Sequence, residues 1–245
     1  MKYPVLVPNI FNYPFTYESE IKLQVGDYVK VPFGKSVITG VIWNDFEKTK
    51  NKKFNIKKIL EKINIKPLKN ETINFLNLLS EYNLVPKGMC LKMHLLGGEA
   101  IHPFDKNEYD EYNLVNKKTD FKLSTEQKKI LKEVLINSKD FRVHLLQGTT
   151  GSGKTIVYFG AIEDKLNQGF QALILLPEIG LTNEFEKKFK EYFGFNAAVW
   201  HSGITQKRKK IIWSGLSEGK IKVVIGARSS LFLPFKKLGV IIVDE

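Results

Sequence analysis

The sequence has 245 residues, of which 43% are hydrophobic and 12% aromatic, and a formal net charge of +12. This composition is typical of a folded protein with a substantial core and excludes a disordered chain. No apolar run approaches the roughly 20 residues that span a bilayer, so we expect no transmembrane helix and no membrane partner. The N-terminal run MKYPVLVPNIFNYPF is broken by prolines, so we expect no signal peptide. The single cysteine, Cys90, excludes an internal disulfide and favours a cytoplasmic location.

The positive charge comes mainly from lysine, and the chain allows two interpretations of it. Many lysines stand beside Asn and Ile, as they would in a lysine-biased proteome. However, two basic parts flank an acidic stretch at 101–120, which fits a two-domain protein that binds a polyanion. Composition alone leaves both interpretations open.

Residues 1–98 have mostly β character. A short apolar run, Lys2–Val7, predicts a strand, and Tyr28–Gly34 with Val37–Trp43 predicts two strands around a turn at Gly34. Helical spacing of apolar residues at 68–84 predicts a helix, with Asn70 as its cap. Residues 99–120 are rich in Asn and Asp, and this composition predicts a linker.

Residues 121–245 alternate between helix and strand. Ser124 and Gln127 form a capping-box pattern at the start of a helix predicted over 124–137. Further helices are predicted over 154–168, 180–193 and 205–218. Strands are predicted over 143–147, 172–176, 197–200, 222–226 and 240–243. The expected fold class is therefore α/β: a small β-rich domain at 1–98, then a doubly wound, largely parallel sheet at 121–245.

The strongest motif is the glycine-rich run from Gly148 to Thr155, which matches G-x-x-x-x-G-K-[ST]. Such a loop wraps nucleotide phosphates with its backbone N–H groups at a helix N-terminus. Lys154 is expected to reach the β- and γ-phosphates, and the Thr155 hydroxyl to bind Mg²⁺. The whole run is thus a predicted ATP site: Gly148, Thr149, Thr150, Gly151, Ser152, Gly153, Lys154 and Thr155.

The second motif lies at the C-terminal end of the sequence and carries two carboxylates. Four apolar residues run into Asp244 and Glu245, as in a Walker B strand. Asp244 is expected to bind Mg²⁺ and Glu245 to polarise the attacking water, so Lys154, Asp244 and Glu245 are the predicted catalytic residues. Gln127 stands one helix before the phosphate loop, where it could read adenine or serve only as the partner of the helix cap.

Further strings make a family resemblance specific. The runs GTTGSGKT, LPEIGLT, HSG, IGARSSLF and PFKKLGVIIVDE resemble the PriA family of replication-restart helicases, also called primosomal protein N′. The resemblance implies a RecA-like first helicase lobe of superfamily 2 at 121–245, with ATP and Mg²⁺ as cofactors. Gln127 would then match the adenine-reading glutamine, and Thr182 and Arg228 would contact DNA or the second lobe. Lys207–Lys210 is expected to be a solvated helix face.

For residues 1–98 the resemblance implies a domain that binds the 3′ end of a nascent DNA strand. Phe15, Thr16 and Tyr17, with Gly34 and Lys57, correspond to its pocket: an aromatic platform, a close backbone approach and a phosphate-binding lysine. Phe15 and Tyr17 could also be plain core aromatics. Thr16 stands where the family often has an acidic residue, which leaves that sugar contact open.

The resemblance also sets expectations about parts that are not seen. The linker is too short for the winged-helix domain of the family, and the chain stops inside the Asp-Glu-x-His motif. The expectation is an N-terminal portion of a 3′-to-5′ DNA helicase, with zinc bound only in a later part, and with primosome and single-strand-binding proteins as partners. Such a portion should bind DNA and nucleotide without unwinding. A stand-alone DNA-binding accessory protein and a P-loop ATPase with a non-nucleic substrate remain alternatives.

Overall fold

The computed structural model describes residues 1–44, 55–96, 112, 123–135, 141–149, 151–176 and 182–244. The chain divides into two compact units. Unit 1 comprises Met1–Asp105 with Phe232–Pro234, and unit 2 comprises Lys106–Leu231 with Phe235–Glu245. The predicted linker falls on the junction between the units, but apart from Tyr112 its residues lie outside the described ranges.

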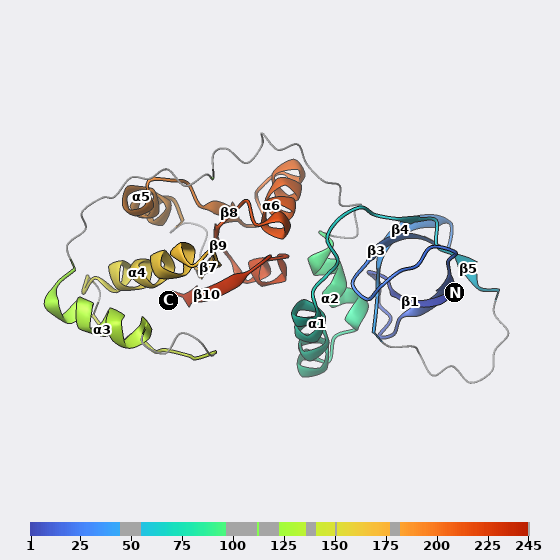
Figure 1. Ribbon diagram of the computed structural model, residues 1–245, viewed down its shortest axis with the longest axis horizontal. Helices are drawn as coiled ribbons and strands as arrows, with labels where there is room; N and C mark the ends of the chain where they lie inside the picture. Colours follow the sequence, from blue (N-terminus) through green and yellow to red (C-terminus); the bar gives the residue numbers. More distant parts are fainter. Residues whose placement is uncertain are drawn as a thin grey trace. The chain divides into compact units, whose positions relative to one another are not determined.

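Unit 1 is built on one six-stranded sheet with the strand order β5-β2-β1-β4-β3-β6. Figure 1 labels β1, β3, β4 and β5 of this sheet. Its strands are β1 (Lys2–Leu6), β2 (Phe15–Glu18), β3 (Tyr28–Phe33), β4 (Ser36–Ile42), β5 (Lys57–Lys58) and β6 (Glu61–Lys62). The predicted hairpin is confirmed: Phe33 pairs with Ser36, and Gly34 takes φ +59° in the two-residue turn. Two helices follow, α1 (Asn70–Asn83) and α2 (Lys87–His94).

The start of α1 differs from the prediction. Lys69 is the N-cap residue, its backbone is extended, and no side chain caps the helix. Asn70 is already helical, so the prediction that it caps the helix is wrong.

Unit 2 holds a four-stranded parallel sheet with the order β10-β7-β9-β8 (Figure 1). Its strands are β7 (Gln171–Leu175), β8 (Ala198–Trp200), β9 (Val223–Gly226) and β10 (Leu238–Val243). Its helices are α3 (Thr125–Leu135), α4 (Lys154–Asn167), α5 (Thr182–Phe193), α6 (Gln206–Glu218) and the 3₁₀ helix η3 (Arg228–Phe232). The predicted alternation of helices with parallel strands is therefore confirmed for these elements.

The strand predicted at Val143–Gln147 is wrong. Residues 141–149 form no regular element, and the side chains of Val143 and Leu145 are 83% and 93% exposed. A strand is stable only when a neighbouring strand satisfies its backbone groups, and none of the described strands pairs with this segment. The apolar residues of this segment favour a strand, but the local sequence does not determine whether a neighbouring strand pairs with it.

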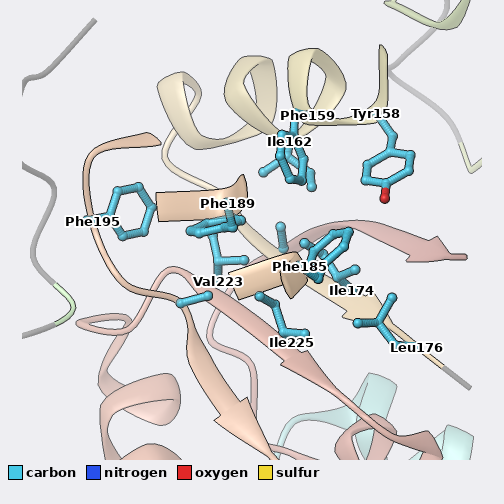
Figure 2. Close-up of a cluster of buried hydrophobic side chains, with 12 residues drawn as sticks. Tyr158, Phe159, Ile162, Ile174, Leu176, Phe185, Phe189, Phe195, Val223 and Ile225 are labelled. Carbon is cyan, nitrogen blue, oxygen red and sulfur yellow. The ribbon is translucent and has the colours of Figure 1, made fainter. Parts of the chain in front are cut away.

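The core of unit 2 lies between the sheet and its helices. Figure 2 shows Phe159 and Ile162 pointing from α4 toward the sheet residues Ile174 and Ile225, all of them buried. Phe189 of α5 completes the stack, with its ring 5.8 Å from that of Phe159. Burying each such side chain contributes roughly 1.5–3 kcal/mol, so this cluster fixes α4, and with it the phosphate loop, on the sheet.

Candidate functional sites

The carboxyl ends of the four parallel strands lie at one edge of the unit 2 sheet. At this edge β7 runs into the LPEIGLT segment, β8 into His201–Gly203, β9 into Ala227 and Arg228, and β10 into Asp244. Sheets of this kind bind ligands at this edge. Residues 177–181 lie outside the described ranges, but the other predicted motif residues here are brought to the same edge.

The phosphate loop folds back on itself. Gly151 and Gly153 have φ of +79° and +82°, a conformation that strains residues with a side chain. The Nζ of Lys154 donates hydrogen bonds to the carbonyls of Gly148 at 2.7 Å and Thr149 at 3.1 Å. The lysine is therefore already folded over the loop, where a phosphate oxygen would replace the two carbonyls as its acceptor.

Gln127 has one of the two roles that the sequence left open, that of partner in the helix cap. Its Oε1 accepts from the backbone N–H of Ser124, and Ser124 Oγ accepts from the N–H of Gln127, so the capping box is confirmed. Its Nε2 also donates to the carbonyl of Ser152 at 3.3 Å. This bond holds the start of α3 against the phosphate loop, and contact of Gln127 with adenine stays a prediction.

Asp244 and Thr155 are joined by a tyrosine that sequence reasoning missed. The hydroxyl of Tyr158 donates to Asp244 Oδ2 at 2.6 Å and also hydrogen-bonds the Thr155 side chain. Burial and the bond to Asp244 raise the pKa of Tyr158, so the hydroxyl keeps its proton and acts as a donor. The only sequence signal was its position three residues after Thr155, which places both on one helix face.

These groups fit a magnesium–nucleotide complex. Magnesium is usually held by one or two carboxylates together with the phosphates of the substrate and water, and a hydroxyl and a carboxylate converge here through Tyr158. Thr150 and Glu245 lie outside the described residues. Within the described ranges no group of three or more His, Cys, Asp or Glu could hold a metal, and the zinc expected elsewhere stays a prediction.

The remaining residues predicted in unit 2 are only partly placed. Arg228 opens η3 at the sheet edge and is exposed. Thr182 is the first residue of α5, and its side chain lies outside the description. Of the predicted solvated run, Lys207 and Arg208 are exposed in the first turn of α6, whereas Lys209 and Lys210 are only partly exposed. Thr205 caps that helix by accepting from Arg208 N at 3.3 Å.

In unit 1 the residues of the second predicted site meet around β2. Lys57 pairs with Tyr17 in the parallel β2–β5 ladder and is exposed. The ring of Phe15 lies 5.4 Å from that of Phe33, the residue before Gly34. Thr16 is exposed on the opposite face of the strand. Phe15 therefore lies beside the Gly34 turn and Lys57 lies on the strand next to β2, but Thr16 is not brought to them.

Tyr17 differs from its neighbours because it belongs to the core. It is 4% exposed, its hydroxyl donates to the carbonyl of Pro32 at 3.2 Å, and burial raises its pKa. Of the two aromatics for which the sequence allowed a core role, Tyr17 has it. Phe15 is only partly buried.

Comparison with known proteins assigns both units. The family model described as the PriA 3′DNA-binding domain matches residues 4–95, and the DEAD/DEAH box helicase model matches residues 124–245. The replication restart protein PriA of Rickettsia conorii is 36% identical over 243 residues, covering 98% of this chain. The chain belongs to the PriA family of replication restart proteins.

Other relatives extend the match. The replication restart protein PriA of Helicobacter pylori strain 26695 is 35% identical over 239 residues, covering 95% of this chain and 35% of its own length. The replication restart protein PriA of Bacillus subtilis is 44% identical over 110 residues, covering 45% of this chain and 14% of its own length. The chain spans about 36% of the length of the Rickettsia conorii protein. In the described part of the chain, no helix is long and apolar enough to cross a membrane.

Proposed function

We propose that this chain supplies the DNA-end-binding domain and the first ATP-binding lobe of an ATP-dependent 3′-to-5′ DNA helicase that acts in replication restart. One observation carries the proposal: the matches to a 3′DNA-binding domain and to a helicase lobe lie in the same chain, and the second match includes the phosphate-loop sequence Gly148–Thr155. The net charge of +12 supports a polyanionic partner. Primosome and single-strand-binding proteins are the partners that the family resemblance suggests.

In the first lobe each residue has a distinct role. Lys154 leaves its two loop carbonyls to neutralise the β- and γ-phosphates. Thr155 and Asp244 would hold Mg²⁺, which would neutralise the negative charge of the phosphates. Glu245 orients the attacking water, and Gln127 contacts the adenine edge. Thr182 and Arg228 contact DNA or the second lobe.

A polypeptide of residues 1–245 should bind nucleotide and DNA but turn over slowly. Enzymes of this class place a transition-state arginine from outside the first lobe, which can be worth about a thousandfold or more in rate. Binding measurements are therefore the appropriate test of the site in this chain.

In unit 1 we propose that Phe15 stacks on the terminal base and that Lys57 binds the adjoining phosphate. The turn at Gly34 is exposed, and no atom lies within 4 Å of the position that a Cβ on Gly34 would occupy. The sugar of the terminal nucleotide can therefore come close to the backbone of this turn. Because Thr16 lies on the other face of β2, we assign it no contact with this nucleotide. Tyr17 supports the strand from the core. Stacking plus a lysine is the chemistry by which proteins hold single-stranded ends.

A 3′-end probe tests this proposal. A fluorescent single-stranded oligonucleotide with a free 3′-hydroxyl should bind more tightly than the same strand carrying a 3′-phosphate. The Lys57→Ala variant should bind the 3′-hydroxyl strand more weakly, and its affinities for the 3′-hydroxyl and 3′-phosphate strands should differ less than those of the wild-type chain. Equal affinity of the wild-type chain for the two strands would remove the end-recognition part of the proposal and leave general DNA binding.

A further inference from the structure

The loop between β1 and β2 is held internally by Asn9 and is fixed to α2 by Asn12 and by its backbone. Asn9 Oδ1 accepts from the N–H of Phe11 at 2.8 Å, and Asn12 Oδ1 accepts from the N–H of Lys87 at 3.1 Å. The carbonyl of Phe11 accepts from the N–H of Gly88 at 3.2 Å. A loop tied at several points presents its side chains at little further entropic cost when a ligand binds.

This loop carries two aromatic rings that lie outside the buried hydrophobic cluster of unit 1. Phe11 is 38% exposed and Tyr13 is half-buried, and neither belongs to the buried cluster of unit 1. Both rings contact Phe15, at centroid distances of 5.4 Å for Phe11 and 5.3 Å for Tyr13. Phe33 contacts Phe15 from another side at 5.4 Å. Phe15 is therefore the centre of a cluster whose loop side reaches solvent.

We infer that Phe11 and Tyr13 form a second stacking subsite, which takes the base of the penultimate nucleotide of the bound strand. The inference rests on the proposed function, in which Phe15 takes the terminal base. The two rings lie 5.4 and 5.3 Å from Phe15, further than the roughly 3.4 Å between stacked bases, so the strand would bind with its last two bases spread apart, as recognised single strands often do. Because every base has a π face, the subsite accepts any base.

Electrostatics favours a nucleotide over an apolar protein segment at this place. Lys57 is exposed on β5, the strand that pairs with β2, and Phe15 begins β2, whereas the neighbouring Lys58 is paired with Glu20 at 3.1 Å. Aromatic rings beside lysines are the usual combination in sites for single-stranded nucleic acid. A backbone passing from Phe15 to the loop would keep its phosphates near this positive charge.

The test places 2-aminopurine, whose fluorescence is quenched by stacking, at either the terminal or the penultimate position of a short strand with a free 3′-hydroxyl. Wild-type chain should quench the probe at both positions. Phe11→Ala and Tyr13→Ala should relieve quenching at the penultimate position only. They should weaken dinucleotide binding about 5- to 100-fold and leave mononucleotide binding unchanged, in line with the cost of removing one stacking ring.

Ile10→Ala is the matched control, because Ile10 is 72% exposed in the same loop and has no ring. It should leave both probe positions quenched. Unchanged penultimate quenching in Phe11→Ala and Tyr13→Ala, with terminal quenching intact, would overturn the second subsite and keep the end-binding proposal. Absence of terminal quenching in the wild-type chain would instead overturn the end-binding proposal itself.

Discussion

Removing the hydroxyl of Tyr158 isolates the link between the two predicted Mg²⁺ ligands. Tyr158→Phe keeps the ring and its contacts with Phe159 and Phe185, whose centroids lie 5.4 and 6.2 Å away. It deletes the 2.6 Å hydrogen bond to Asp244. Asp244 and Thr155 then lose the group that holds them in one arrangement before the ligand arrives.

The size of the effect follows from the bond. A hydrogen bond to a charged group contributes about 1.5–3 kcal/mol, and the partial exposure of Asp244 places this one near the lower end. A loss of about 1.5 kcal/mol corresponds to roughly tenfold weaker binding. We therefore expect the Mg²⁺ concentration needed for half-maximal binding of a fluorescent ATP analogue to rise about tenfold.

The assay compares titrations with Mg²⁺ and with EDTA. Binding without Mg²⁺ should be the same in wild type and Tyr158→Phe, because the phosphate loop is untouched. Tyr192→Phe is the control, since it also loses a tyrosine hydroxyl in unit 2, one bonded to Glu163 at 3.3 Å away from the phosphate loop. Identical Mg²⁺ curves for wild type and Tyr158→Phe would refute the reasoning, as would an equal shift in Tyr192→Phe.

Three further predictions concern stability and nucleotide choice. Burial lowers the pKa of His94 from 6.5 to about 4, so the unfolded chain binds more protons between these values. Unit 1 should therefore lose on the order of 3 kcal/mol as pH falls from 6.5 to 4, seen as smaller protection factors in β3 and β4 once the slower intrinsic amide exchange at low pH is divided out. A pH-independent exchange free energy would contradict this burial. Gly26→Ala should destabilise unit 1 by about 2 kcal/mol or more, because φ is +90° and the new Cβ meets the Leu68 backbone; an unchanged urea midpoint for unit 1 would show the strain to be absent. Gln127→Ala should reduce the preference for ATP over GTP analogues, measured by competition, and loss of affinity for both alike would leave Gln127 only its capping role.

The motifs with fixed spacing could be predicted from sequence because their chemistry requires that spacing. Lys154 and Thr155 must follow the glycines, and Asp244 must end an apolar strand, so each was found where the structure has it. Parallel strands and their helices also followed from periodicity. Tyr158 was missed because a tyrosine in an apolar helix carries no motif, and only folding brings β10 to its hydroxyl.

Predictions failed where a neighbour decides the outcome. The run Val143–Gln147 suits a strand, yet no described strand pairs with it. The two-residue strands β5 and β6 are defined by their pairing with β2 and β3, and two residues are too few to show a strand pattern in the sequence. The contacts of Phe11 and Tyr13 with Phe15 depend on the path of the loop, so the sequence alone did not single out these two residues.

The central claim is that one chain carries two separable sites, one for nucleotide and one for a DNA 3′ end. The most direct measurement determines both affinities, for a fluorescent ATP analogue and for a 3′-hydroxyl oligonucleotide, in wild type, Lys154→Ala and Lys57→Ala. Lys154→Ala should weaken nucleotide binding at least about tenfold and leave 3′-end binding unchanged, since it removes the charge that faces the phosphates. Lys57→Ala should do the reverse. If each variant lost both activities while remaining folded, the two-site account would be contradicted.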